Sequence, residues 1–293
     1  MTTYRSLALL AFGTRQTRAG LVYHLAHKLA SQGERVLVLD LHPFAFVTES
    51  LLRDRGVFEQ WIENPPQQGW WDSETDIAPL RIAEGLHLLP GDPLLLQQGS
   101  KRGPREKVEI LLRQIEQAAR NSDSTWVLMA LDFTATPWTC PALLAVRHLV
   151  LIPDALPRSL RALPIAGELL KAAVHYGAGR PAPEALGYIV PRPLQKVFGP
   201  NDVYASCLAR LPGAYRAAMG LPAGEALQVD QDPYCLALVD RPAGLYELAS
   251  EAEVPAFLLR PVHGASETLM QAVFAADRIY SALVETLRVR CGL

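Results

Sequence analysis

The sequence lacks the common signatures of catalysis. Across its 293 residues there is no G-x-S-x-G nucleophile elbow, no H-E-x-x-H helix and no Rossmann G-x-G-x-x-G turn. The four cysteines are widely spaced and include no C-x-x-C pair. This spacing argues against a zinc site or a disulfide framework and is typical of a reducing cytosol. We therefore predict no metal centre and a cytoplasmic location.

Surplus charge and long apolar runs are also absent. With 28 basic and 30 acidic side chains the net charge is -2, which gives no general attraction to nucleic acid or to anionic membranes. The apolar stretch near the N-terminus spans about six residues, which is too short for a signal peptide or a membrane span. We expect a soluble protein that has no membrane partner.

Short apolar runs alternate with longer helical patterns along the whole chain. The predicted strands are 7–12, 35–40, 86–89, 126–131, 148–152, 186–190 and 254–259. The predicted helices are 18–32, 44–54, 104–120, 139–146, 158–175, 201–218 and 266–289. Such alternation predicts an α/β fold with a doubly wound, mainly parallel sheet and helices on both faces. We expect residues 1–293 to form a single domain, because no long linker divides them.

The first strand, turn and helix have the layout of a phosphate-binding site. The apolar run 7–12 leads into Gly-Thr-Arg-Gln-Thr-Arg-Ala-Gly at 13–20, and a helical pattern follows until Gly33. A second apolar strand then ends at Asp40. Strand, turn, helix and strand in this order typically open a nucleotide-binding α/β domain.

Several later segments carry a family resemblance, and their order and spacing make it specific. They are the helix and strand 24–40, the strand and turn 84–91 (Glu-Gly-Leu-His-Leu-Leu-Pro-Gly), the strand 126–132, the segment 151–161 and the segment 240–255. Together they resemble the ParA/MinD family of deviant Walker-A ATPases, which position plasmids, chromosomes and other cargo. The resemblance covers nearly the whole chain. It implies a P-loop NTPase-like fold of the ParA/MinD type.

The phosphate-binding turn departs from the family pattern K-G-G-x-G-K-[ST] at every functional position. Those positions hold Gly13, Thr14, Arg15, Thr17, Arg18 and Ala19. A β-branched Thr forced to positive φ costs about 1–3 kcal/mol. Ala19 has no hydroxyl for the magnesium ion that bridges the terminal phosphates. Arg18 keeps a positive charge where an anion would lie, but a solvated arginine in the first helical turn is the favoured interpretation.

The resemblance assigns four further residues to a nucleotide site, should one be retained. Asp40 and Asp132 match two acids near the metal and switch regions. His42 stands where the family has the Asp linked to the attacking water, and Arg241 falls in the segment that lines the adenine. Each also has a structural interpretation, since polar residues after strands commonly close turns or cap helices.

Two groups of side chains are candidate interaction surfaces. A basic cluster of Lys101, Arg102, Arg105 and Lys107, with Arg158 and Arg161, is a candidate nucleic-acid contact; the alternative is a solvated surface. Trp61, Trp70 and Trp71 are a candidate partner surface, since aromatic side chains often anchor protein interfaces. The alternative for these tryptophans is a hydrophobic cluster that covers the sheet edge.

These observations lead to three functional hypotheses. The first is a pseudo-ATPase that uses no cofactor and acts as a scaffold or regulator in a partition or positioning system. Its partner would be an active ParA-type paralogue or a cargo adaptor, and it would form a homodimer. The second is a divergent ATPase that binds ATP and magnesium, dimerises and contacts nonspecific DNA. The third keeps DNA binding without nucleotide.

Overall fold

The structure is a computed structural model. It describes residues 4–12, 15–52, 59, 70–72, 78–91, 95, 102–132, 136–177, 179–193, 203–224, 227–242, 244–252, 254–260 and 266–292. Within these ranges the side chains of 15–18, 132, 176 and 193 are outside the description.

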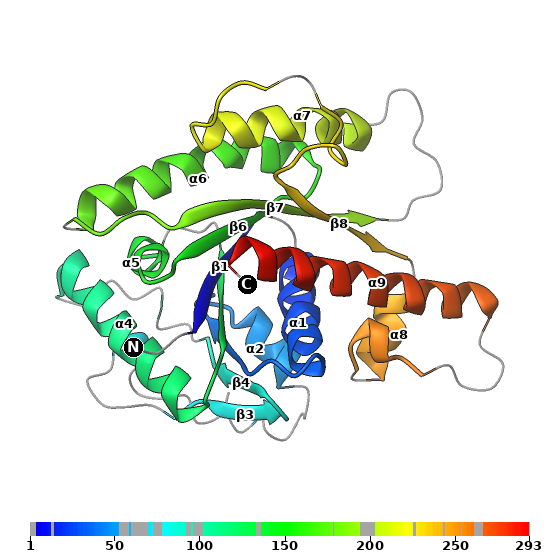
Figure 1. Cartoon of the computed structure of the whole chain (residues 1–293), viewed down its shortest axis with the longest axis horizontal. Coiled ribbons are helices and arrows are strands. Elements are labelled where there is room, and N and C mark those ends of the chain that lie inside the picture. Colours follow the sequence, from blue (N-terminus) through cyan, green and yellow to red (C-terminus); the bar gives the residue numbers. More distant parts are fainter. Residues whose placement is uncertain are drawn as a thin grey trace.

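Eight strands form one sheet in the order β3-β4-β2-β5-β1-β6-β7-β8 (Figure 1). The strands are β1 (Arg5–Ala11), β2 (Val36–Asp40), β3 (Leu80–Ala83), β4 (Leu86–Leu89), β5 (Trp126–Asp132), β6 (His148–Ile152), β7 (Glu184–Pro193) and β8 (Cys235–Arg241). Neighbouring strands are parallel except for β3, which pairs antiparallel with β4. The mainly parallel sheet predicted from the sequence is thus confirmed.

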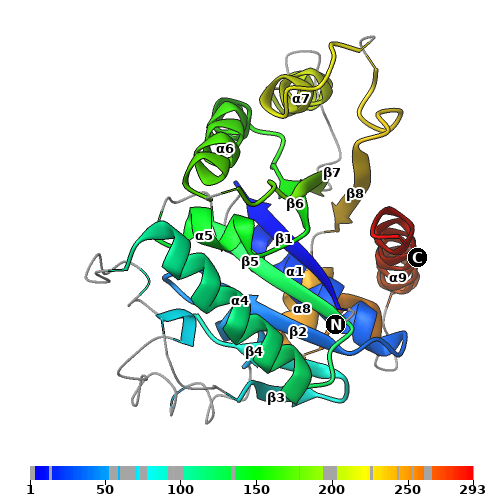
Figure 2. The ribbon, with the colours of Figure 1, turned by 60° about the vertical axis from the view of Figure 1, so that its left-hand side comes forward.

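Helices cover both faces of this sheet (Figures 1 and 2). The α-helices are α1 (Arg15–Ser31), α2 (Phe46–Leu51), α4 (Pro104–Asn121), α5 (Thr139–Leu144), α6 (Pro157–Tyr176), α7 (Val203–Ala218), α8 (Leu245–Glu251) and α9 (Glu267–Arg290). Two short 3-10 helices are η1 (Trp70–Asp72) and η3 (Ala256–Leu258). Helices α4, α5 and α6 lie on one face, with α7 packed on α6, whereas α1, α2, α8 and α9 lie on the other.

The core consists of two apolar layers, one on each side of the sheet. Along β1, Ala8 and Leu10 belong to the layer under α4–α7, while Leu7 and Leu9 belong to the layer under α1 and α9. This alternation follows from the two-residue period of a strand. Because both faces are covered, β1, β2 and β5 read as unbroken apolar runs rather than as alternating ones.

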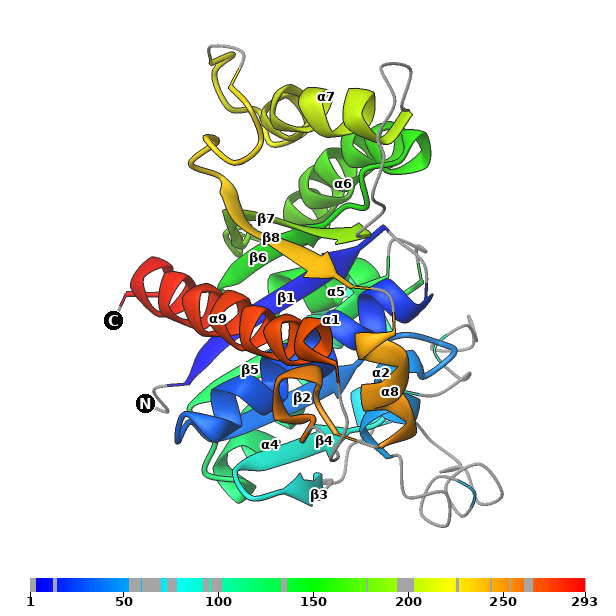
Figure 3. The same cartoon turned by 90° about the vertical axis from the view of Figure 1, so that its right-hand side faces the viewer.

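The C-terminal helix α9 runs alongside α1, as Figure 3 shows, and His24 of α1 anchors the contact. The His24 ring donates from Nδ1 to the Gly20 carbonyl, accepts the Ala256 N–H at Nε2 at 3.0 Å, and stacks on Tyr280 at 5.3 Å between centroids. Lys28, one turn further along α1, pairs with Asp277 of α9 at 2.5 Å. Among the described helices, none is both long and apolar enough to cross a bilayer.

The structure corrects four features of the predicted element pattern. Residues 254–259, predicted to be a strand, contain the 3-10 helix η3, which begins directly after Pro255; a proline has no N–H to donate to a neighbouring strand. The strands β3 and β8 and the helix α8 were not predicted. Both strands lie at sheet edges, where half-exposed side chains blur the apolar pattern.

Candidate functional site

The carboxyl ends of β1, β2 and β5 form the sheet edge where a nucleotide site is predicted. β1 lies between β5 and β6 in the sheet, although the chain runs from β1 to β2, so the strand order reverses beside β1. Open α/β sheets bind ligands at such a reversal, outside the carboxyl ends of the strands. Helix α1 begins directly after this point. The sequence and the topology therefore indicate the same edge.

Part of the predicted phosphate-binding turn falls outside the described residues. This applies to Thr14 and to the side chains of Arg15, Thr17 and Arg18. The side chain of Asp132 is likewise outside the description, although its backbone ends β5 opposite Ala11 of β1. The nucleotide contacts assigned to these residues stay predictions.

Ala19 is the described residue of the turn that matters most, and it belongs to the core. It is 4% exposed and lies in the apolar layer under α1. A small cavity of about 20 Å³ adjoins it. Its lining is Leu9, Ala11, Ala19, Val22, His42, Phe46, Val47, Ala130 and Leu131. A space of this size holds about one water molecule, whereas ligand pockets measure several hundred Å³.

Asp40 ends β2 with its side chain completely buried, and three donors occupy its carboxylate. Oδ1 accepts the His42 N–H at 3.0 Å, and Oδ2 accepts both the N–H and the hydroxyl of Thr48 at 2.8 Å. Burial raises the pKa of Asp40, and these hydrogen bonds counteract the rise. Thr48 lies in the first turn of α2, so the carboxylate acts as a cap for that helix.

Gly91, which follows β4, extends this hydrogen-bond network through Thr48. Its N–H donates to the Thr48 hydroxyl at 2.8 Å, so Thr48 bridges Asp40 and Gly91. A Cβ at position 91 would lie 2.8 Å from the His42 carbonyl oxygen and 2.9 Å from Asp40 Cγ. Only a glycine allows the chain after β4 to approach the end of β2 this closely.

His42 begins a tight turn that presents an aromatic side chain to solvent. Its Nδ1 accepts the Phe44 N–H at 3.0 Å, and its carbonyl accepts the Ala45 N–H at 2.9 Å. Ala45 has φ 49 and ψ 38, a left-handed conformation that is costly for a residue other than glycine. Phe44 is 65% exposed and stacks on Phe46 at 5.7 Å. The His42 side chain itself is buried beneath these rings, 4.4 Å from Phe46 between centroids.

Arg241 ends β8 and covers the ring of Tyr246, with its guanidinium carbon 4.8 Å from the ring centroid. Its neighbour Asp240 pairs with Arg192 of β7 through two bonds, at 2.5 and 3.0 Å. The sequence did not indicate this pair, because β8 was not predicted. Two facing residues at the ends of parallel strands become neighbours only through the sheet register.

Two arginines of the basic cluster, Arg102 just before α4 and Arg105 in its first turn, pair with acids of α4, and Lys107 is buried. Arg102 pairs with Glu106 at 2.6 Å and Arg105 with Glu109 at 3.1 Å, each one helical turn apart. Lys101 is outside the described residues. Lys107 is 9% exposed, with its ammonium group 5.2 Å from the Trp138 ring centroid. Its assignment to an exposed nucleic-acid contact is therefore corrected.

Of the two basic residues at the start of α6, Arg158 forms an ion pair and Arg161 is exposed. Arg158 donates to the Asp154 carboxylate, which also accepts the Ser159 hydroxyl. This arrangement ties the end of β6 to the first turn of α6. Arg161, one turn further along, is exposed.

The tryptophan surface is also corrected. Trp70 and Trp71 are 3% and 2% exposed and belong to the apolar layer beneath α4. The Trp70 indole donates to the Pro90 carbonyl at 2.8 Å, so its one polar atom is satisfied inside the protein. These two indole rings are therefore buried in the core and are not exposed to a partner. Trp61 is outside the described residues.

Comparison with solved structures identifies the fold, whereas no protein-family model and no curated protein sequence matches the chain. The ATP complex of a Cyanothece McdA variant has a TM-score of 0.64 at 14% identity, covering 98% of this chain and 97% of that one. The Pyrococcus furiosus cell division ATPase MinD gives 0.57 at 15%, covering 98% and 99%. The pNOB8 ParA bound to nonspecific DNA gives 0.60 at 15%, covering 98% of each chain. The chain thus has the ParA/MinD fold.

Proposed function

We propose that this chain with the ParA/MinD fold is a nucleotide-independent scaffold or regulator of a partition or positioning system, acting through protein binding. The observation that carries the proposal is the apolar environment of Ala19, at the position where a metal–triphosphate site needs a hydroxyl. The fold is shared with proteins whose names include partition and cell division functions.

Two described residues of the predicted site, Ala19 and Asp40, support a chain that holds no magnesium–triphosphate complex. Magnesium takes hard oxygen ligands, and the phosphates need room as well as donors. The Ala19 side chain offers neither a metal ligand nor a donor, and the Asp40 carboxylate already accepts three hydrogen bonds from His42 and Thr48. Catalytic residues are not assigned.

The turn at 42–46 supports a role in binding a protein at the same edge. Phe44 is held outward by a rigid turn whose strained Ala45 is fixed between Gly91 and the start of α2. An aromatic side chain that is already fixed in place loses little entropy when it is buried by a partner. We assign this surface to an active ParA-type paralogue, a cargo adaptor or a second copy of this chain.

Calorimetry with ATP and magnesium tests the proposal. We expect no binding heat for the wild-type protein. Ala19→Thr restores the missing hydroxyl and serves as the matched variant, and we expect it to remain inactive because Asp40 is still engaged. Micromolar ATP binding with turnover by the wild-type protein would contradict the proposal.

The alternative is a divergent ATPase that dimerises on ATP and binds nonspecific DNA. It is favoured by solved structures of the same fold whose names include ATP and nonspecific DNA. In this case Arg18 would hold the phosphates, and Arg18→Ala would abolish ATP-stimulated dimerisation. Light-scattering mass measured with and without ATP and magnesium separates the two functions, because the scaffold keeps one mass in both conditions.

A further inference from the structure

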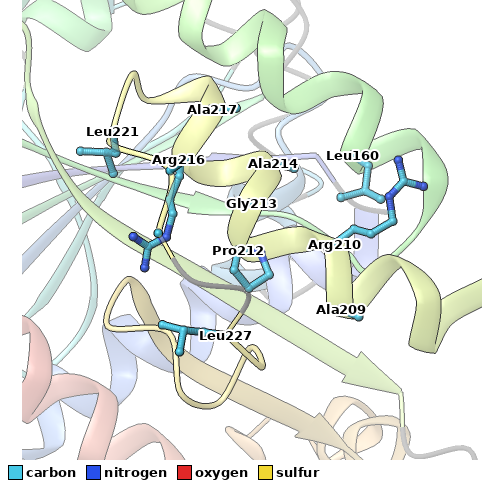
Figure 4. Close-up of a pocket in the computed structure, with 12 residues that line it drawn as sticks. Leu160, Ala209, Arg210, Pro212, Gly213, Ala214, Arg216, Ala217, Leu221 and Leu227 are labelled. Carbon is cyan, nitrogen blue, oxygen red and sulfur yellow. The ribbon is translucent and has the colours of Figure 1, made fainter.

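A groove lies along α7, between this helix and the described residues of the segment that follows it (Figure 4). Its volume is about 540 Å³, within the range of small-molecule sites. The described residues of the segment that follows α7 form one wall, and Leu160 of α6 contributes a further apolar side chain. Apart from two arginines, the lining side chains are apolar or small.

Arg216 is the most constrained charged group in this groove. Its Nη2 donates to Asp232 Oδ1 at 3.0 Å, and its guanidinium carbon lies 5.2 Å from the Tyr234 ring centroid. Its side chain is 14% exposed. Asp232 is itself fixed by the Tyr188 hydroxyl at 2.7 Å. A guanidinium held by an acid on one edge and an aromatic ring beside it is preorganised to receive a further acceptor.

Gly224 allows the segment after α7 to cross this guanidinium. A Cβ at position 224 would lie 2.5 Å from Arg216 Nη1 and 2.9 Å from Cζ. Because Arg216 is pinned by Asp232, it has little freedom to move aside. Figure 4 shows the guanidinium on the same side of α7 as Leu221 and Leu227. The cation therefore lies among apolar side chains that line the same groove.

The charges and the apolar walls together define the ligand class. Arg210 is exposed on α7 and adds a second cation, while none of the lining residues that the structure describes is acidic. Asp232 balances one of these two charges. We propose that the groove binds a small amphipathic anion, whose carboxylate or phosphate contacts Arg216 and whose apolar body lies along α7, where Arg210 adds a further positive charge to the lining. The proposal uses no residue of the β1–α1 turn and stands independently of the proposed function.

Binding of three eight-carbon probes to the full chain tests this proposal by calorimetry. Octanoate and octyl phosphate carry the two head groups, and octanol has the same apolar body without charge. We expect at least one anion to bind about tenfold more tightly than octanol, since charge-assisted hydrogen bonds supply that difference. The tighter anion identifies the head group. Equal affinity for octanol, or no binding of either anion at millimolar concentration, would overturn the proposal.

Two variants at exposed positions locate the site without disturbing the buried pair. Arg210→Gln should weaken anion binding several-fold and leave octanol unchanged. Ala217→Trp should fill the groove and remove binding of all three probes. Arg105→Gln on α4 is the matched control and should bind as wild type does. Unchanged binding by Ala217→Trp would show that the probes bind elsewhere and would refute the groove.

Discussion

At the scale of single residues, the sheet edge combines family-like positions with different chemistry. Asp40 is present where the resemblance places an acid, yet its oxygens cap α2 through Thr48 rather than facing a metal. The sequence left this structural role open for Asp40, and the structure supports it. For Trp70 and Trp71 the alternative of a covered cluster was the correct one, because burial depends on what crosses the sheet edge and not on the residues themselves.

The three hydrogen bonds to the Asp40 carboxylate predict the effect of a nearly isosteric substitution. Asp40→Asn keeps the side-chain shape but turns an NH2 group toward donors, so one buried hydrogen bond is lost and one donor is left unpaired. We expect a loss of about 2 kcal/mol in the free energy of unfolding, measured with urea. Asp123→Asn is the control, because Asp123 is exposed at positive φ, where Asn is well tolerated. Equal stability of the two variants would contradict this role.

Glu34 predicts a pH dependence of stability. Burial acts to raise the pKa of Glu34, but hydrogen bonds from Thr125 and Arg288 outweigh it and lower the pKa below 4.5. A lowered pKa means that the ion pair stabilises the fold above pH 4.5 and that this contribution is lost as the pH falls through the folded-state value.

Glu34→Gln is the variant that checks this sign. Its urea midpoint of unfolding should be lower than that of the wild type at pH 7. The difference between the two midpoints should become smaller toward pH 3.5. Glu168→Gln, which removes an exposed pair with Lys171, should show neither effect. A difference in urea midpoint that stays constant or grows on acidification would be inconsistent with the assigned ion pair.

At the scale of elements, the predictable part was the buried sheet. The runs at 7–12 and 126–131 are apolar on both faces because helices cover both, and they were located to within two residues. The edge strands β3 and β8 escaped prediction because half of their surface meets solvent or helix ends. The groove along α7 had no signal in the sequence, since Gly224 and Arg216 meet only through the path of the chain after α7.

The contact between α6 and α7 predicts a size limit at Gly167. A Cβ at this position would lie 2.2 Å from the Ala218 carbonyl oxygen, which is backbone and cannot rotate away. Gly167→Ala should therefore destabilise the protein by about 1–3 kcal/mol, although alanine favours helices. In Gly213→Ala the new Cβ meets nothing within 4 Å, so that variant should gain up to about 1 kcal/mol. Thermal melts of the two variants should shift in opposite directions.

At the scale of the whole molecule, charge limits what the protein binds. The net charge is -2, and the α4 arginines are paired within their helix. Exposed ion pairs weaken each arginine as a phosphate contact, because the neighbouring acid repels the backbone of the duplex.

A gel-shift series in salt examines this expectation. The protein should shift duplex DNA only at low salt. The shifted fraction should be the same for an Arg102→Ala/Arg105→Ala double variant. The slope of log affinity against log salt should correspond to about two phosphate contacts or fewer. A steep slope that the double variant reduces would instead favour DNA binding without nucleotide.

His24 has a consequence for how this molecule can be observed. One imidazole holds the Gly20 carbonyl near the beginning of α1, the Ala256 amide and the Tyr280 ring of α9, three points far apart in sequence. We therefore expect a displacement of the first turns of α1 to shift the C-terminal helix as well. Phe274 on α9 is 62% exposed. A dye attached at position 274 can therefore report the binding of a partner near the beginning of α1.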